Sequence, residues 1–382
     1  MSLLSSLLPL VSDLSPLQAP HDLVVACTAL LLRDANAGAY AGRTMELSME
    51  LPYVIASIPK GHAFASTADD HQPLRFATDY AIFAIAVPNG SVDDLKIVEG
   101  VNEQGLSFSV LAYAGASGPA DNAEKTKALL AAIDLGAFVL GQCATTGEVK
   151  TKLAENTVLL TALAPLHGAT TPFHFVVHDR AGQSLVIEFS DHQQNVYDNP
   201  VGVMTNGPAF PWHLTNLNNY TFLSNRDQST GKFGALTVTQ PDSGIATAGL
   251  PASNTSVGRF VRAAYYATFA EKTEPAQAIR SLAHVMNNFD RPRGITIDPP
   301  QSGGLDIEGI SAAPGQAYKT EYTSWTVLAD LGNDAFYVRT YQALNYSRFD
   351  LKRIFAAAKF KVVPLDQIAQ IETLDATGAL LP

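Results

Sequence analysis

Four pairs of short apolar segments, each joined by a turn signal, constrain the fold of this 382-residue chain more than any other feature. Apolar runs that flank a few Asp, Asn or Gly residues are typical of β-hairpins, in which neighbouring strands run antiparallel. The sequence therefore predicts antiparallel sheet in several parts of the chain. The pairs are 24–30 with 40–46, 96–102 with 106–112, 173–178 with 184–189, and 325–330 with 335–340.

The remaining segments divide between further strands, helices and one long loop. Strands and helices occur in clusters, without the steady alternation that βαβ units require, and this favours antiparallel sheets with helices packed on their outer faces. The chain is therefore predicted to be α+β. Strands are expected at 51–59 and 80–87, helices at 123–142, 146–155, 257–270 and 275–287, and a Gly- and Pro-rich loop at 291–318.

Composition excludes several classes of protein. Hydrophobic residues make up 47% of the chain and charged residues 16%, as in an ordinary globular protein that can bury a large core. The net charge of −11 argues against a general nucleic-acid binder, because phosphate contacts need clustered Lys and Arg. No run of about 18 or more apolar residues occurs, so we expect no transmembrane helix.

The two cysteines, Cys27 and Cys143, are too few for a disulfide scaffold. Cys143 follows an apolar helical run and is predicted to be a buried structural thiol. His174 and His178 have the i, i+4 spacing of a metal pair, but they fall on a predicted strand. We therefore interpret them as core histidines and expect no metal site.

Cys27 lies in the first hairpin, and its partners there give it a chemical setting. If the turn centres near Asn36, Arg43 and Glu46 lie roughly level with Cys27, so that a thiol, a guanidinium and a carboxylate meet. A cut between Ala26 and Cys27 would leave a free α-amine, whose reference pKa is about 7.7–8.0. One residue would then supply both the nucleophile and its base, with no histidine needed.

Four sequence blocks follow this hairpin along the chain. They are Val203-Met204-Thr205-Asn206-Gly207-Pro208, the segment 212–220, Gly249-Leu250-Pro251 with Ser256-Val257-Gly258-Arg259-Phe260, and Tyr322-Thr323-Ser324-Trp325-Thr326. In this order, after Cys27, they resemble the choloylglycine hydrolase and penicillin V acylase family of N-terminal-nucleophile hydrolases, which cut linear amide C–N bonds. The resemblance covers essentially all of 27–350. It implies a four-layer αββα sandwich, two mostly antiparallel sheets between helical layers, as a single domain over 27–382.

The resemblance also implies roles for individual residues. Cys27 would be the nucleophile, and the side-chain amide of Asn206 would stabilise the oxyanion of the tetrahedral intermediate. The backbone N–H of Ala112 would be the second oxyanion donor. Arg43 would hold the terminal amine and tune its pKa.

Glu46 and Arg259 complete the implied cluster. Glu46 shares the task of Arg43 at the amine, and Arg259, near the start of a predicted helix, supports the same cluster. Two positions depart from the family pattern. Glu46 stands where the family has Asp, so its carboxylate reaches one methylene further. Ala112 stands where relatives carry Asn or Tyr, so it offers the substrate no side-chain contact.

Residues 1–26 are expected to be removed before Cys27, and three kinds of segment fit them. They lack Lys and Arg, so the basic start of a secretory signal is missing. Val24 and Ala26 nevertheless suit the small-residue positions before a signal-peptidase cut, and the run 24–27 resembles a lipoprotein box. A propeptide that the chain removes itself is the third option. A periplasmic or secreted location is slightly favoured over a cytoplasmic one.

The predicted activity is hydrolysis of small N-acyl amides, such as conjugated bile salts or penicillin V, without a metal or organic cofactor. An N-acyl homoserine lactone acylase is the alternative within the family. The resemblance implies a homotetramer, with the segment 216–256 resembling the part that mediates assembly, and neither nucleic-acid binding nor stable membrane insertion is expected. Outside the family, a papain-like cysteine hydrolase and a non-catalytic lipoprotein lipidated at Cys27 are the rival hypotheses.

Overall fold

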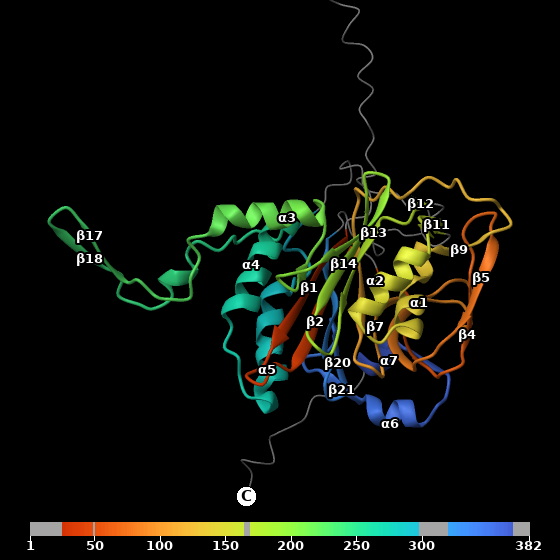
Figure 1. Cartoon of the computed structure of the whole chain (residues 1–382). Coiled ribbons are helices and arrows are strands. Elements are labelled where there is room, and N and C mark those ends of the chain that lie inside the picture. Colours follow the sequence, from red (N-terminus) through yellow and green to blue (C-terminus); the bar gives the residue numbers. More distant parts are fainter. Residues whose placement is uncertain (1–24, 49, 164–168, 298–319, 370–382) are drawn as a thin grey trace, which may run out of the picture.

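The computed structural model consists of two large sheets that face each other and carry helices on their outer sides (Figure 1). The structure describes residues 25–48, 50–163, 169–297 and 320–369. All strand pairs within the two large sheets are antiparallel. The α+β class and the four-layer αββα order are confirmed.

The first sheet holds the N-terminal hairpin at its centre. Its six strands lie in the order β16-β1-β2-β19-β20-β21, so the hairpin is joined on one side by a short strand and on the other by the C-terminal strands. The bounds are β1 Val25–Arg33, β2 Ala39–Leu47, β16 Val203–Met204, β19 Tyr322–Asp330, β20 Ala335–Thr340 and β21 Ser347–Asp350.

The second sheet has eight strands in the order β15-β14-β13-β8-β7-β6-β3-β22. Its inner face packs against the first sheet. The larger of the two main cores includes the apolar side chains between the sheets and also those of the helices Ser256–Phe269 and Pro275–Met286. The bounds are β3 Val54–Ile58, β6 Ile82–Pro88, β7 Leu95–Asn102, β8 Ser107–Ala112, β13 Phe173–His178, β14 Ser184–Ser190, β15 Gln193–Asp198 and β22 Lys361–Pro364.

Two pairs of helices form the outer layers. Helices α4 (Ser256–Phe269) and α5 (Pro275–Met286) cover the first sheet, packing on β1 and β2. Helices α1 (Leu135–Gln142) and α2 (Thr146–Glu155) lie on the other side, where α1 packs on β7 and β8 over the second main core. The N-terminus of α4 is fixed by Thr255, whose side chain accepts a hydrogen bond from the Gly258 N–H at 3.2 Å.

The predicted hairpins are all present, and both helices of the α4–α5 pair lie within a residue of their predicted ends. The helix predicted over 123–142 is wrong in its first half. Residues Ala128–Ala131 form strand β9, which pairs in parallel with β5 and β10, and a 3₁₀ turn (Ala132–Asp134) precedes α1. An apolar run of this length satisfies a strand or a helix equally well, and the available strand partners decided for the strand.

Smaller elements complete the described chain. A four-stranded mixed sheet adjoins α1, a two-stranded ladder follows it, and three short helices lie at the edges. Their bounds are β4 Ala63–Ser66, β5 Gln72–Ala77, β10 Val158–Leu159, β11 Ala162–Leu163, β12 Ala169–Thr170, α3 Phe210–Asn216, α6 Leu351–Ala356 and α7 Leu365–Ala369. Further 3₁₀ turns cover Leu217–Tyr220, Ile245–Thr247 and Asn287–Phe289.

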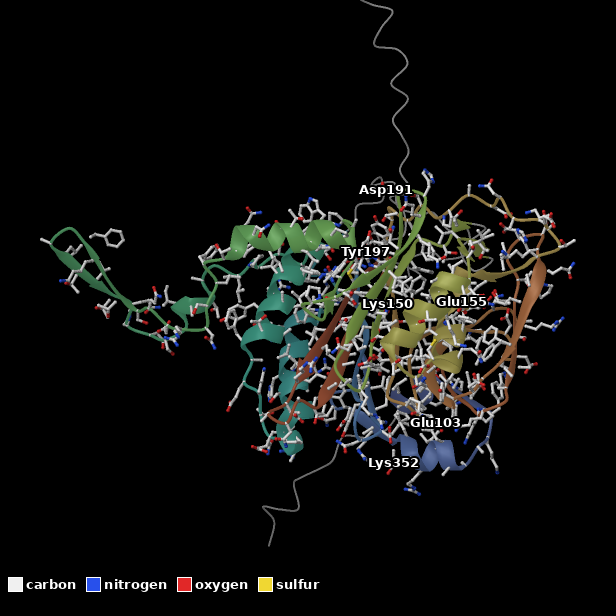
Figure 2. The ribbon with its side chains drawn as sticks, viewed as in Figure 1. Glu103, Lys150, Glu155, Asp191, Tyr197 and Lys352 are labelled. Carbon is white, nitrogen blue, oxygen red and sulfur yellow. The ribbon has the colours of Figure 1, made fainter. Side chains whose placement is uncertain are left out.

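Residues 221–250 form an arm that projects from the body and ends in a hairpin of β17 (Thr230–Phe233) and β18 (Leu236–Thr239) (Figure 1). Figure 2 shows side chains filling the body between the ribbons, whereas those of the arm stand apart. Of the long loop predicted at 291–318, residues 291–297 contain neither helix nor strand, and the rest lies outside the described residues. None of the described helices is both long and apolar enough to cross a membrane.

Candidate active site

The β1–β2 hairpin sets the position of the predicted nucleophile. Backbone pairing places Cys27 opposite Met45, Ala29 opposite Arg43, and Ala26 opposite Glu46, so the segment 43–46 lies roughly level with Cys27, as the sequence predicted. Side chains alternate between the faces of a strand, so the thiol shares its face with Arg43 and Met45. That face looks into the core between the two sheets, whereas Glu46 looks towards the α4–α5 layer.

On the inner face, a guanidinium lies against the thiol. Arg43 Nη2 is 3.4 Å from the Cys27 Sγ, and it also donates to the carbonyl oxygen of Val110 at 2.5 Å. The guanidinium carbon lies 4.6 Å from the ring centroid of Trp325. The Met45 sulfur is 3.8 Å from Sγ. Arg43 is thus fixed next to the thiol by its contacts with a backbone carbonyl, an aromatic ring and a methionine sulfur.

Glu99 belongs to this cluster, and the sequence analysis missed it. Its Oε2 lies 3.6 Å from Arg43 Nε, and both side chains are buried. Burial raises the pKa of Glu99 to about 7, against the lowering effect of Arg43 and of a hydrogen bond from Ser109. The signal available in the sequence was an acidic residue next to the apolar run Ile97–Val98 of a predicted strand.

The backbone groups of Cys27 are held by two other predicted residues. The Cys27 N–H donates to Asn206 Oδ1 at 2.9 Å, and the Cys27 carbonyl oxygen accepts from Arg259 Nη1. Arg259 Nη2 donates to the same Asn206 Oδ1 at 2.7 Å, and its Nη1 also donates to Thr28 Oγ1 at 2.9 Å. Arg259 and Asn206 therefore clamp the nucleophile residue through its main chain.

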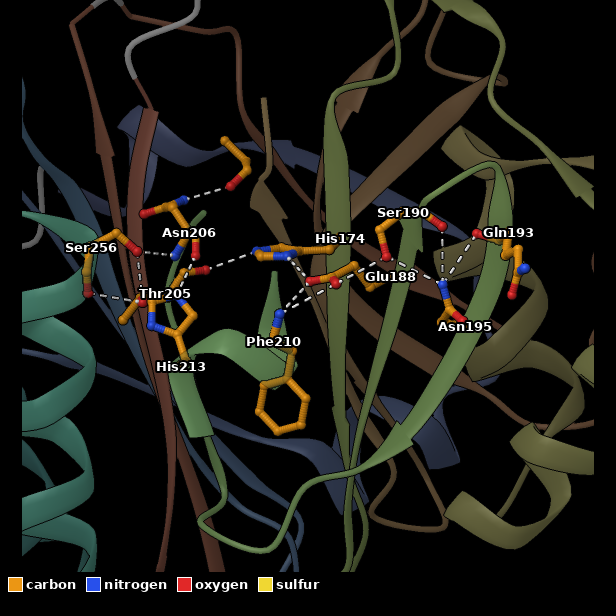
Figure 3. A network of polar contacts seen from close by, with 11 residues as sticks. His174, Glu188, Ser190, Gln193, Asn195, Thr205, Asn206, Phe210, His213 and Ser256 are labelled. Carbon is orange, nitrogen blue, oxygen red and sulfur yellow. Dashed lines mark hydrogen bonds and ion pairs between the residues drawn. The ribbon is translucent and has the colours of Figure 1, made fainter. Parts of the chain in front are cut away.

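The predicted oxyanion donors lie beside each other. Asn206 Nδ2 donates to the Ala112 carbonyl oxygen at 2.8 Å (Figure 3). The Ala112 backbone lies near enough to the Cys27 sulfur to lower the pKa of the thiol, against the larger raising effect of burial. Both predicted donor residues therefore lie next to Cys27, although the Asn206 amide is bonded to a protein carbonyl in this state.

The prediction that the Glu46 carboxylate meets the thiol together with Arg43 is wrong. Glu46 pairs with Ala26, one residue before Cys27, so its side chain lies on the opposite face of the hairpin from the thiol. Its Oε1 accepts a hydrogen bond from Thr323 Oγ1 at 3.1 Å, while its buried Oε2 has no hydrogen-bond partner among the described residues. Burial raises the pKa of Glu46 to about 7, and Arg259 lowers it most among the neighbouring groups. A buried carboxylate oxygen that lacks a donor can accept a hydrogen bond from a newly formed amine.

The electrostatic setting keeps the Cys27 thiol protonated in this state. Burial raises its pKa; Arg43 and Arg259 lower it, and Glu46 raises it further. Burial also lowers the pKa of Arg259 to about 10, against the raising effect of Glu46. The cluster thus holds two buried arginines and two buried glutamic acid side chains near one thiol.

A pocket of about 370 Å³ adjoins the peptide bond before Cys27. Its lining includes Ala26, Asn206, Arg259, Arg291 and Thr296. Ala26 is the last residue of the segment predicted to be removed, so the pocket lies on the side where a free α-amine would form. Arg291 is paired there with Glu321.

The remaining sequence candidates lie outside this cluster. Glu50, considered as a substitute for Glu46, is exposed and pairs with Arg293 at 2.7 Å. Cys143 is a buried free thiol whose pKa burial raises to about 12, as predicted for a structural residue. His174 and His178 are both buried on β13, as core histidines should be.

Comparison with known proteins identifies the family. The profile of the "Linear amide C-N hydrolases, choloylglycine hydrolase family" matches residues 27–354, which is most of the chain. This chain belongs to that family. Membership makes it a hydrolase of linear amides, and the match begins at the residue predicted to be the nucleophile.

Bile salt hydrolases and a penicillin V acylase are similar in sequence to the chain. The bile salt hydrolase/transferase of Clostridium perfringens is 25% identical over 330 residues, covering 86% of this chain and 93% of that protein. The bile salt hydrolase/transferase of Lactiplantibacillus plantarum is 26% identical over 346 residues, 86% of this chain and 96% of that protein. The penicillin V acylase of Pectobacterium atrosepticum is 26% identical over 246 residues, 63% of this chain and 60% of that protein.

Two solved structures share the fold of this chain. A mutant of the conjugated bile acid hydrolase from Clostridium perfringens superposes with a TM-score of 0.75 at 22% identity, covering 91% of this chain and 100% of that one. The penicillin V acylase from Agrobacterium tumefaciens gives a TM-score of 0.68 at 21% identity, covering 91% and 94%. The predicted N-terminal-nucleophile fold is therefore confirmed.

Proposed function

We propose that this chain hydrolyses linear amides of apolar acyl groups with Cys27 as an N-terminal nucleophile. One observation carries the proposal: every polar group of Cys27 contacts a residue that the sequence singled out. The thiol lies against Arg43, the N–H donates to Asn206, and the carbonyl oxygen accepts from Arg259. This arrangement suits a residue whose position must be fixed for chemistry.

The first step of the proposed mechanism is removal of residues 1–26, which leaves 27–382 as the mature domain. Cleavage of the Ala26–Cys27 bond turns the backbone N–H into an α-amine. The Glu46 oxygen that lacks a hydrogen-bond donor among the described residues supports a role in holding this amine. Asn206 Oδ1, already 2.9 Å from the Cys27 nitrogen, would remain its second acceptor.

In the proposed catalytic cycle, the α-amine takes the thiol proton and the thiolate attacks the amide carbonyl carbon. The Asn206 amide and the Ala112 N–H donate to the oxyanion, which is a stronger acceptor than the carbonyl that Asn206 now contacts. The ammonium then passes its proton to the leaving amine, and the C–N bond breaks. Water hydrolyses the resulting thioester, releasing the acid and restoring the thiol.

We propose conjugated bile salts or penicillin V as the substrate type, because the relatives that align with the chain carry those names. Both substrates join an apolar acyl group to a small amine through one amide. Ala112 supports an open acyl site, since a methyl group occupies the position where relatives carry larger side chains. The alternative within the family is an N-acyl homoserine lactone acylase.

We also propose that the enzyme assembles as a homotetramer through its arm. Phe222, Phe233 and Leu236 of the arm are 65%, 73% and 63% exposed. Large apolar side chains on a projecting hairpin favour contact with another protein surface over contact with water. The segment is part of the 216–256 region that resembles the family's assembly element.

The decisive experiment is intact mass spectrometry of the purified protein, before and during incubation with penicillin V, glycocholate or an N-acyl homoserine lactone. A mass that starts at Cys27, together with a transient acyl adduct, is expected. Cys27→Ala should form no adduct and release no acid. A mature protein that retains residues 1–26 and still hydrolyses amides would favour a papain-like mechanism, and a mass increased by fatty acyl chains without hydrolysis would favour a lipoprotein.

A further inference from the structure

A buried polar network behind Asn206 has no role in the mechanism above. It joins β13 and β14 of the second sheet to the segment that follows β16 of the first (Figure 3). Its centre is His174, which is 0% exposed, as is the neighbouring Glu188. Burying two ionisable groups is costly unless their partners fix them well, so the network calls for a physical explanation.

His174 contacts a carbonyl on one side and a carboxylate on the other. Its Nε2 lies 2.9 Å from the Thr205 carbonyl oxygen, and its Nδ1 lies 3.2 Å from Glu188 Oε2. A carbonyl oxygen only accepts, so Nε2 must carry a proton and donate it. The Phe210 N–H also donates to Glu188 Oε2, at 3.0 Å. Glu188 therefore fixes the His174 ring, whose Nε2–H donates to the Thr205 carbonyl oxygen.

A second histidine holds the next carbonyl along the chain. His213 Nε2 lies 2.8 Å from the Asn206 carbonyl oxygen, and its ring stacks on Phe260 with centroids 4.4 Å apart. Burial lowers the pKa of His213 to about 4, so the ring is neutral near pH 7 and donates its single proton from Nε2. Consecutive carbonyls are thus held by two imidazoles.

These contacts fix both peptide planes of Asn206. The peptide unit before the Asn206 Cα is held at both ends. His174 donates to the Thr205 carbonyl oxygen, and the Asn206 N–H donates to Ser256 Oγ at 2.9 Å. The plane after its Cα is held by His213. With both planes fixed, the backbone dihedrals of Asn206 are fixed, and so is the direction of its Cα–Cβ bond, from which the amide projects.

His174 also contacts the other proposed oxyanion donor. Its ring stacks on Tyr113, with centroids 4.9 Å apart and planes 4° from parallel. Tyr113 directly follows Ala112, whose N–H is the second donor. One ring therefore contacts the segments that carry both proposed donors.

We propose that His174, paired with Glu188, and His213 are positioning residues that aim the Asn206 amide at the carbonyl group attacked by Cys27. The inference rests on the proposed function in one respect, the role of Asn206 as an oxyanion donor. Neither histidine touches the reacting atoms. Their effect is therefore on transition-state stabilisation, whereas substrate binding is left nearly unchanged.

The test compares His174→Phe with His178→Phe. The first variant keeps a ring to stack on Tyr113 and removes the hydrogen bond to Thr205. The second is the matched control, because His178 is buried on the same strand and neither of its ring nitrogens has a hydrogen-bond partner among the described residues. Wild type and Cys27→Ala are measured first, so a failure of the proposed function appears as a lack of Cys27-dependent hydrolysis by wild type.

Rates are divided by the concentration of active sites with a free Cys27 amine. Burst titration gives that concentration, and intact mass shows which fraction of the protein starts at Cys27. His174→Phe should lower kcat by about 10- to 100-fold with KM within about threefold, because misplacing a group by about 1 Å costs about that much. His178→Phe should keep both constants. If His174→Phe turns over at the wild-type rate, or if both variants lose activity equally, the inference is wrong.

Two further measurements keep the inference testable if that variant does not fold or no substrate is found. His213→Phe preserves the stacked ring on Phe260 and carries the same expected fall in kcat. A crystal structure of either variant needs no substrate. The 2.9 Å bond between the Cys27 N–H and Asn206 Oδ1 should be lost or lengthened, and an unchanged Asn206 would contradict the proposal.

Discussion

The guanidinium of Arg43 reaches the sulfur of Cys27 even though the two residues are not backbone partners. Arg43 Nη2 lies 3.4 Å from Sγ, while the backbone of Arg43 pairs with Ala29, two residues further along β1. The long side chain runs back along the strand, between the ring of Trp325 and the carboxylate of Glu99. A positive charge is thus fixed beside the thiol.

Replacing Arg43 with Lys should lower activity because an ammonium cannot reproduce the planar contacts of the guanidinium. We expect kcat to fall about 10²-fold and the pH dependence of Cys27 alkylation by iodoacetamide to move to higher pH. Arg33→Lys, at the far end of the same hairpin, is the control and should leave both unchanged. An alkylation profile like that of wild type would contradict the role given to Arg43.

The buried carboxyls of Glu46 and Glu99 should make the protein less stable as the pH rises. Each has a folded-state pKa of about 7, above the ordinary value of 4.5, so the folded protein keeps a proton that the unfolded chain loses. The free energy of unfolding should therefore fall from about pH 4.5 to about pH 7, by up to about 1.4 kcal/mol per pH unit for each group.

Denaturant unfolding at several pH values checks this slope. Glu99→Gln should make it shallower, to the part that Glu46 contributes, because an amide does not titrate. Glu103→Gln is the matched control on the adjacent turn (Figure 2), where the side chain pairs with the exposed Lys60, and it should keep the wild-type slope. An equal slope in Glu99→Gln and wild type would show that Glu99 is already ionised in the folded state.

The role of Glu46 predicts a difference between a shortened and a neutral side chain. Glu46→Asp keeps the charge and restores the residue that the family carries, so kcat/KM should stay within about threefold. Glu46→Gln cannot hold an ammonium as well, and kcat/KM should fall about 10- to 100-fold, the usual range for acid–base assistance. The pH–rate profile of each processed variant gives the measurement. If Gln and Asp behave alike, the carboxylate does not act on the amine.

Gly105 should tolerate no side chain, because its backbone is in the left-handed region and other atoms lie close to the position that a Cβ would take. Its φ is +76°, and an added Cβ would collide with the Leu331 carbonyl oxygen and come within 2.8 Å of Arg180 Nε. Gly105→Ala should lower the free energy of unfolding by more than about 2 kcal/mol. Gly90→Ala is the control, with φ of +82° and no atom within 4 Å of the added Cβ, and should cost about 1 kcal/mol. Thermal melts distinguish the two, and equal losses would mean that the collision relaxes freely.

Charged residues on the arm should weaken assembly. Phe233→Asp with Leu236→Asp places two charges on the exposed hairpin, and sedimentation should show a shift from tetramer to smaller species. Val92→Asp, which alters a 53% exposed residue on the body, is the control. A tetramer that persists in the arm variant would place the subunit interface elsewhere.

Local signals explain why much of the fold could be predicted. The hairpins form because an apolar run, a turn and a second run lie close in sequence, so the β1–β2 register followed from the turn near Asn36. The segment 123–142 was misjudged because Ala128–Ala131 pairs with strands distant in sequence. The roles of Cys27 and Asn206 were inferred from motifs, whereas Glu99 carries no motif and was missed.

The sequence by itself determined the hairpins and the level of Arg43 with Cys27, because these depend on contacts between near neighbours in the chain. Only the tertiary structure decided where Glu99 points. A bulge opposite Ile85 and Ala86 leaves Val98 unpaired, so Ile97 packs in the outer core and Glu99 turns inward to Arg43. A single extra residue exchanges the side chains that point to the two faces of a sheet. Where that residue lies depends on how two sheets pack, which no local sequence pattern encodes.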